Sequence, residues 1–268
     1  MKIPSINLYN KMPAHTAFCA KNKDTRNADD VMRASSNAFP MFKPTYASIF
    51  YKSLKDCDVR EKFYYGIAKK NHENVRKERD DAIEDINFAE KITKLIKEQK
   101  TGNCAEAADI ALMGLLANGY YKSQSVGLEC EVGYIDKNTG ETVWSYCEPI
   151  DHACVLTDMN NPKRKYVEDL IVVDPWLNRS GSVSEMREKY KKIFLTDKKM
   201  QQIKYNLRQR FGFEFSGDNL KNKPDLTNCA FSTKIVFYTS NKYETQEAKE
   251  IGKRMAEKYP ELVIKRDE

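Results

Sequence analysis

The sequence predicts a mixed α+β fold in which an apolar helix packs on an antiparallel sheet, with additional helices toward both ends of the chain. Three observations lead to this expectation. Residues 104–118 carry small and apolar side chains over a wide helical stripe, and three strand-like runs follow between residues 126 and 173. With 268 residues, of which 41% are hydrophobic, the chain is long enough to bury one sizeable core.

One compact domain is expected after an irregular start. Residues 1–44 mix four prolines with polar residues, which favours an irregular or partly disordered lead. Residues 45–268 then form a single domain, with its core at 84–177 and a C-terminal extension at 178–268. Aromatic and apolar residues at 46–68 suit short packed helices that contribute to this domain.

Two helices are expected to carry the chain into the sheet. Residues 71–100 show apolar side chains at helical spacing in their second half, which predicts a long helix. A turn at Thr101-Gly102-Asn103 separates it from the next helix, which has a wide buried stripe and a reasonable stop at Gly119.

The sheet is expected to consist of strands at 126–135, at 142–147 together with 152–157, and at 166–173. Asn138-Thr139-Gly140 marks the first hairpin turn, and residues 159–164, with their proline, mark the second.

The C-terminal extension alternates helix and strand patterns. Ser182 or Ser184 is a suitable cap for a helix at about 185–210, and Thr196-Asp197 is expected to interrupt that helix. Further elements are predicted as a strand at 231–239, a helix at 244–258 and a short terminal strand at 262–264. The sequence leaves open whether this part extends the sheet or forms a face for substrate recognition.

Cys104 is the strongest candidate for a nucleophile. It follows a Gly-Asn turn at the start of the apolar helix, where unpaired backbone N–H groups and about half a positive charge favour the thiolate. The competing interpretation is a structural thiol, because cysteine is among the most buried residue types. Glu106, in the first turn, complements the helix dipole and is assigned a structural role.

His152 and Asp174 complete a candidate triad. His152 lies on a predicted strand, where it could act as base and acid, and Asp174 ends the next strand, where it could orient the imidazole. Asp151 and Asp158 are lesser candidates for the orienting acid. The structural alternatives are that the histidine is a half-buried strand residue and that the aspartate ends a strand before a proline.

Stabilisation of an oxyanion needs hydrogen-bond donors near the thiol. The backbone N–H of Cys104 is one candidate, and the second donor is Gln99 or the side chain of Asn103. Trp176 follows the candidate acid; it can contact substrate, although packing beneath the site is the favoured interpretation.

These motifs, in the order Gly102-Asn103-Cys104, Asp151-His152-Ala153 and Val173-Asp174-Pro175-Trp176, resemble the papain-like and transglutaminase-like superfamily of cysteine enzymes. Among these, the chain looks most like the compact versions found in bacterial toxins and secreted effectors. The resemblance implies a helix carrying the nucleophile, packed on an antiparallel sheet that carries histidine and then aspartate. It also implies attack on an amide through a thioester, as in proteases, glutamine deamidases, transglutaminases, peptide N-glycanases and acyltransferases. The absence of an aromatic residue directly after Cys104 favours the transglutaminase-like branch.

Composition bounds the partners and the setting. A net charge of +6 with interspersed acids indicates solvated faces; an acidic protein or an anionic membrane surface is the functional alternative, and no nucleic-acid motif is present. Seven cysteines fit a reducing compartment better than a disulfide scaffold. No apolar leader or span of ~20 residues is visible, so we expect a soluble protein, cytoplasmic or delivered without a classical signal into a host cytosol.

We therefore expect a thiol hydrolase or acyl transferase that acts on a protein substrate, needs no cofactor and holds no metal. Two alternatives stay open. One is a binding module that kept the fold but not the chemistry. The other is structural zinc, whose candidate ligands match no paired-knuckle spacing: these are Cys130, Cys147, His152 and Cys154.

Overall fold

A five-stranded antiparallel sheet organises the molecule. The computed structural model describes residues 23–41, 71, 73–79, 81, 88–211, 228–241 and 243–264. The strands are β1 (Gln124–Asp136), β2 (Thr142–Thr157), β3 (Ile171–Asp174), β4 (Arg179–Ser182) and β5 (Cys229–Asn241). Their order in the sheet is β4-β3-β2-β1-β5, and every neighbouring pair is antiparallel. The predicted α+β class with an antiparallel sheet is thus confirmed.

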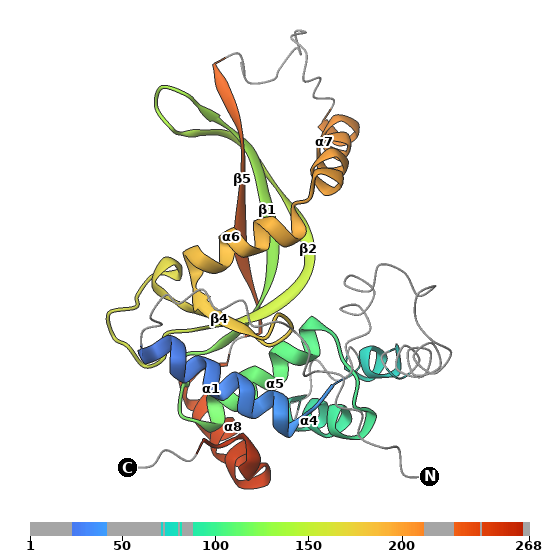
Figure 1. Cartoon of the computed structure of the whole chain (residues 1–268), viewed down its shortest axis with the longest axis vertical. Coiled ribbons are helices and arrows are strands. Elements are labelled where there is room, and N and C mark those ends of the chain that lie inside the picture. Colours follow the sequence, from blue (N-terminus) through green and yellow to red (C-terminus); the bar gives the residue numbers. More distant parts are fainter. Residues whose placement is uncertain are drawn as a thin grey trace.

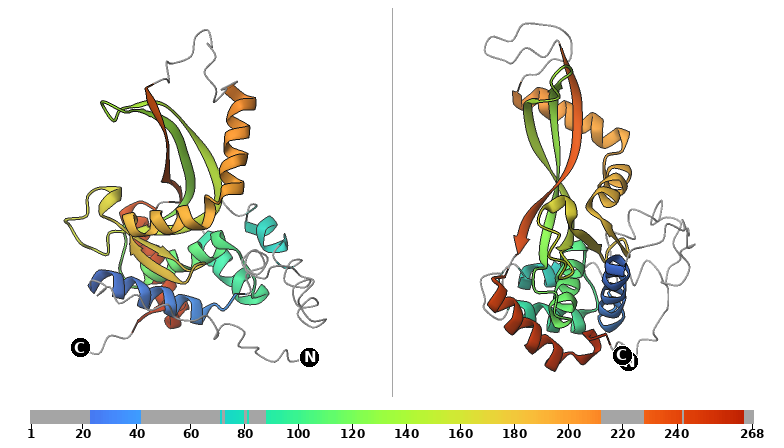
Figure 2. Two further views of the ribbon diagram at one scale, coloured as in Figure 1. Left: turned by 45° about the horizontal axis from the view of Figure 1, so that its top comes forward. Right: turned by 90° about the vertical axis from the view of Figure 1, so that its left-hand side faces the viewer.

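Helices cover both faces of this sheet. They are α1 (Lys23–Ala38), α4 (Phe88–Gln99), α5 (Cys104–Ala117), α6 (Val183–Phe194), α7 (Asp197–Phe211) and α8 (Thr245–Lys258), with short 3₁₀ turns η2 (Val167–Asp169) and η3 (Pro260–Leu262). Helices α1, α4 and α8 gather around α5 at one end of the molecule (Figure 1). Strands β1, β2 and β5 extend away from that end as an arm, with α6 and α7 on one side of it (Figure 2).

Helix α5 is the centre of the larger core. It is apolar almost all the way round, which is the pattern of a buried helix rather than of an amphipathic surface helix. It packs against α1, α4, α8 and the β2–β3 part of the sheet. Gly114 lets α1 come close, because a Cβ added there would lie only 2.0 Å from the Ser35 hydroxyl oxygen. The small residues of α5 therefore serve close packing.

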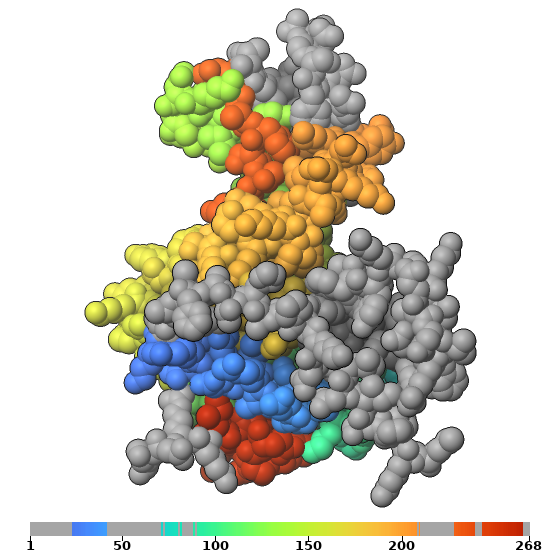
Figure 3. Space-filling view, in the orientation of Figure 1, coloured from blue at the N-terminus to red at the C-terminus, as the bar shows by residue number. Residues whose placement is uncertain are grey.

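A second core lies on the opposite face of the sheet. Alternate residues of β1, starting at Val126, point to this face by the period-two geometry of strands. They pack against buried residues of α6 and α7, including Met186, Tyr190, Ile203 and Leu207. The space-filling view shows α6 lying across this side of the molecule, between the arm and the helical end, and α7 lying beside the arm (Figure 3).

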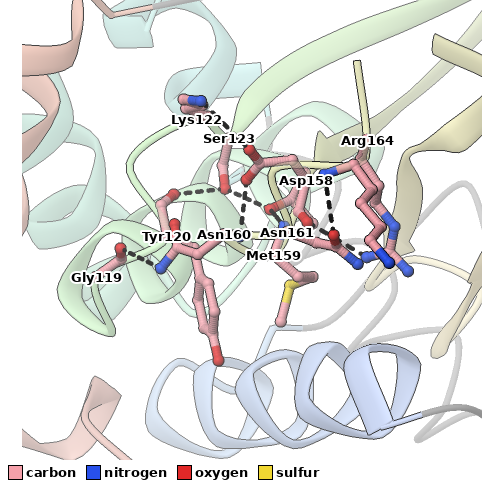
Figure 4. A network of polar contacts seen from close by, with 11 residues as sticks. Gly119, Tyr120, Lys122, Ser123, Asp158, Met159, Asn160, Asn161 and Arg164 are labelled. Carbon is pink, nitrogen blue, oxygen red and sulfur yellow. Dashed lines mark hydrogen bonds and ion pairs between the residues drawn. The ribbon is translucent and has the colours of Figure 1, made fainter. Parts of the chain in front are cut away.

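The C-terminal end of α5 is tied to the end of β2 by neutral hydrogen bonds (Figure 4). The Ser123 hydroxyl donates to the Tyr120 carbonyl (2.7 Å) and lies 3.0 Å from the Thr157 hydroxyl. The Asn160 side chain donates to the Gly119 carbonyl (3.0 Å). These contacts join the segment that follows α5 to the end of β2 and the turn after it.

Three predicted elements were wrong. The irregular lead contains α1 at 23–38, a stretch without proline whose buried residues Ala28, Val31 and Met32 recur at helical spacing. The strand predicted at 166–173 is the 3₁₀ turn η2 followed by the shorter β3, because only its last residues pair with β2. The strand predicted at 262–264 is replaced by η3, in which Pro260 starts a turn that buries Leu262.

Other expectations were confirmed or refined. The helix expected from about residue 185 is capped by Ser182 and interrupted before α7, at Thr196, as predicted. The two runs placed at 142–147 and 152–157 are one strand, β2, and β4 was not predicted. Strand β5 pairs with β1, so the C-terminal extension adds a strand to the edge of the sheet. The second half of the expected 71–100 helix is α4, whereas the helices expected at 46–68 lie outside the described residues.

Within the described ranges, no helix combines the length and apolar character needed to cross a bilayer.

Candidate active site

Cys104 is the first residue of α5, directly after the N-cap residue Asn103. The first N–H groups of a helix have no partner within it, and they give this end a partial positive charge. The thiol is largely buried, with the residue 6% exposed, and Sγ lies 4.0 Å from the carbonyl oxygen of Asp151 on β2. The structure thus brings the predicted helix start against the predicted histidine strand.

A bulge in β2 presents His152. Ala153 pairs with Gly127 of β1, but the next pair is Ile150 with Leu128, so Asp151 and His152 are two extra residues in β2. Bulges bend a strand and redirect its side chains, and they often occur beside active sites. Here the bulge turns Asp151 outward to solvent and buries His152, which is 4% exposed.

Asp174 is held at the end of β3 by three donors. Its Oδ2 lies 2.7 Å from His152 Nε2 and accepts a hydrogen bond from the Tyr190 hydroxyl (2.8 Å). Its Oδ1 accepts from the Leu177 backbone N–H (3.0 Å). The side chain is completely buried; burial raises the pKa of Asp174, but His152 and these hydrogen bonds outweigh it and hold the pKa below its usual value. The carboxylate is therefore ionised beside the imidazole.

The surroundings of His152 favour the imidazolium. Burial lowers its pKa, but the Asp174 carboxylate and the nearby Cys104 sulfur raise it, with a net value of about 9. His152 is thus protonated at neutral pH. Because Nε2 faces Asp174, Nδ1 is the other ring nitrogen, and it is buried without a hydrogen-bond partner among the described residues.

Aromatic rings enclose the imidazole on the α6 side. The ring centroid of His152 lies 5.0 Å from those of Trp176 and Phe194 and 5.5 Å from that of Tyr190. Trp176 is 3% exposed. It therefore packs against His152, as the sequence favoured, and presents little surface to a substrate. The rings also exclude water from the His152–Asp174 pair, which strengthens its electrostatic attraction.

The two proposed oxyanion donors differ in their placement. Asn103 is buried as the N-cap, next to Cys104, and its backbone N–H donates to Glu106 Oε2 (2.7 Å). Gln99 ends α4, and its backbone carbonyl accepts a hydrogen bond from the Asn71 side chain (3.5 Å). Of the two, Asn103 is the one that the structure holds beside the thiol.

The candidate zinc ligands do not form a metal site. Cys154 is completely buried, and burial raises the pKa of its thiol, with Asp174 acting in the same direction. Cys147 is exposed on the arm, where Glu129 and Glu131 lie around it. Across the described part of the chain, no three His, Cys, Asp or Glu side chains are arranged to hold a metal ion.

Sequence reasoning missed two contributors to this site. Tyr190 lies on the helix predicted from about residue 185, but no local signal indicated that its hydroxyl would reach Asp174. Arg79 was not singled out, although its Nε donates to Asp109 Oδ2 on α5 (3.1 Å). Both contacts join segments far apart in the sequence, so periodicity could not reveal them.

The chain was compared with protein-family models, with curated proteins and with solved structures, and none of the three comparisons gave a match. Function is therefore inferred from the geometry of the site.

Proposed function

We propose that this protein is a cysteine-dependent amide hydrolase in which Cys104 is the nucleophile, His152 the general acid and base, and Asp174 the residue that orients the imidazole. The observation that carries the proposal is the buried 2.7 Å contact between His152 Nε2 and Asp174 Oδ2, with the Cys104 sulfur close enough to raise the His152 pKa. A buried imidazolium beside a thiol at a helix start favours the reactive thiolate.

The reaction follows from these charges. The Cys104 thiolate attacks the amide carbonyl carbon, and the developing oxyanion is stabilised by the Cys104 backbone N–H, with the Asn103 carboxamide as second donor. His152 gives its proton to the departing amine as the C–N bond breaks, which leaves a thioester on Sγ. Water then loses a proton to His152 and attacks the thioester, which releases a carboxylic acid and restores the Cys104 thiolate and the protonated His152.

The substrate is proposed to be a protein. The sequence motifs resemble papain-like and transglutaminase-like cysteine enzymes, and α5 packed on the antiparallel sheet is the arrangement which that resemblance implies. Cleavage of a peptide bond and deamidation of a glutamine share every step above, whereas transfer requires an amine in place of the water.

Selective chemical labelling tests the proposal. The native protein is treated with iodoacetamide at mildly acidic pH, and each cysteine is quantified by mass spectrometry. We expect Cys104 to react first, because it begins a helix and lies near the His152 imidazole, a setting in which a thiol is activated as a nucleophile. The rate should fall in His152→Ala and stay unchanged in the control variant Cys147→Ala, which removes an exposed thiol on the arm.

Equal labelling of all accessible cysteines, or labelling of Cys104 that does not depend on His152, would refute the proposal and favour a binding module. If labelling is selective, mass spectrometry of candidate protein substrates distinguishes the reactions. A cleaved chain indicates proteolysis, an amide-to-acid mass shift indicates deamidation, and a cross-link indicates transfer.

A further inference from the structure

Two buried carboxylates lie on the first turns of the helix that begins at Cys104. Glu106 and Asp109 are spaced by three residues, which places them on one face of α5. They are 0% and 3% exposed. Carboxylates at such burial need partners, because removing an ionised group from water is costly.

Arg79 is a partner that the two carboxylates share. It lies in the described segment 73–79, well before α5 in the sequence. Its Nε lies 3.1 Å from Asp109 Oδ2 and 3.9 Å from Glu106 Oε1. Its guanidinium carbon lies 5.9 Å from the centroid of the Phe88 ring at the start of α4, so both charge and packing hold it.

Glu106 also touches the turn that delivers the nucleophile. Its Oε2 accepts the backbone N–H of Asn103 (2.7 Å). Gly102 packs directly on it, since a Cβ added to Gly102 would lie 2.9 Å from the Glu106 Cβ and 2.8 Å from the Met41 sulfur. The backbone at residues 102–103 is therefore seated on the Glu106 side chain, one residue before the thiol.

We propose that Arg79, Glu106 and Asp109 form a positioning network that holds the Gly102–Asn103 turn, and thereby keeps the Cys104 sulfur beside His152. The proposal rests on the proposed function, because it explains how that thiol is placed. Arg79 links the segment before α4 to the start of α5 and is held there by Asp109. Glu106 contacts both Arg79 and the Asn103 backbone N–H, so it connects Arg79 to the turn. None of the three residues contacts the reacting atoms.

The network is sensitive to pH. The charged groups that face Asp109 in the described structure are Arg79 and Glu106. Burial raises the pKa of Asp109, Glu106 adds to the rise and Arg79 opposes it, with a net value of about 6. Above that pH the Asp109 carboxylate is charged beside the Arg79 guanidinium. Below it, Asp109 gains a proton and its ion pair with Arg79 is lost.

The test uses two readouts on the full chain. The first is the rate of Cys104 alkylation by iodoacetamide as a function of pH. The second is the pKa of His152 by NMR, which reports whether the sulfur stays next to the imidazole even if the protein catalyses nothing. Glu106→Ala should slow alkylation roughly 10- to 100-fold and lower the His152 pKa, because a displacement of about 1 Å has effects of this size.

Conservative and control variants separate positioning from folding. Glu106→Gln keeps an oxygen acceptor for the Asn103 N–H, so it should restore most of the alkylation rate lost in Glu106→Ala. Asp109→Asn should remove a step near pH 6 from the alkylation profile. Arg79→Gln should resemble Glu106→Ala, whereas Arg33→Gln, at an exposed pair with Asp30, should resemble the wild type.

The outcomes distinguish the two proposals. If Glu106→Ala and Arg79→Gln fold normally but leave both the alkylation rate and the His152 pKa at wild-type values, the positioning network is wrong. If Cys104 is unreactive in the wild type yet these variants still lower the His152 pKa, the network is correct and the proposed hydrolase is wrong.

Discussion

The two faces of the sheet carry different halves of the candidate site and hold them by different means. On the α6 face, His152 and Asp174 are enclosed by aromatic rings and a tyrosine hydroxyl. On the α5 face, Cys104 begins a helix whose first turns are supported by buried charges. On the α6 face, neighbouring side chains set the pKa of the His152 imidazole. On the α5 face, contacts to the backbone before Cys104 set the position of the thiol. Variants on the two faces should therefore fail in different ways.

The largest effect is expected from Asp174→Asn, on the α6 face. The substitution keeps the size of the side chain but removes the charge that raises the His152 pKa, and it lets the imidazole adopt the wrong tautomer. We expect kcat/KM toward an amide substrate, and the alkylation rate of Cys104, to fall by roughly 10³- to 10⁴-fold. The His152 pKa, followed by NMR, should move toward 6.5 or below.

The control is Asp30→Asn, an exposed aspartate on α1, which should leave both quantities unchanged. A wild-type alkylation rate in Asp174→Asn would show that the thiol does not depend on the buried pair.

The stability contributed by His152 should disappear at alkaline pH. Its pKa is raised from 6.5 to about 9 in the folded state, so its contribution is fully present below pH 6.5 and is lost as the pH rises through 9. A shift of this size corresponds to roughly 3 kcal/mol. Urea denaturation of the wild type and His152→Gln should give a difference in unfolding free energy that shrinks across this window. A difference that does not vary with pH contradicts a buried imidazolium.

On the α5 face, the folded state favours the neutral form of Asp109, whereas it favours the charged form of His152. The effect of Asp109 on stability should therefore appear at more acidic pH. Its pKa is raised from 3.8 to about 6, so ionisation costs stability, and stability falls as the pH rises from 3.8 to 6. Asp109→Asn lacks this titration. The unfolding free energy of the wild type, relative to this variant, should therefore decrease by roughly 3 kcal/mol between those pH values. A constant difference would mean that Asp109 titrates normally.

The smallest effect is expected from Tyr190→Phe. It removes the hydroxyl that donates to Asp174 but keeps the ring that packs against His152. Losing one hydrogen bond to a buried carboxylate should lower the unfolding free energy by about 1–3 kcal/mol, with a smaller loss of kcat/KM than in Asp174→Asn. Tyr205→Phe, at an exposed tyrosine on α7, provides the matched control. Equal behaviour of the two variants would show that the Tyr190 hydroxyl contributes nothing measurable.

The sequence predicted the parts of this molecule that depend on local signals. The start of α5 after Gly102-Asn103, the break between α6 and α7 at Thr196 and the hairpin turn at residues 138–140 all follow from turn and capping preferences. Local signals also misled. The prolines around α1 concealed a helix between them, and the pattern along β2 was divided into two apparent runs at 142–147 and 152–157.

The sequence by itself determined the order and type of the residues that could perform the chemistry: a thiol at a helix start, a strand histidine and an aspartate at a strand end. Only the tertiary structure decided how they meet. The β2 bulge at Asp151 and His152, the Tyr190 contact and the shared Arg79 each depend on pairing between distant segments. The physical reason is that burial and long-range register, rather than local propensity, decide which polar groups must become partners.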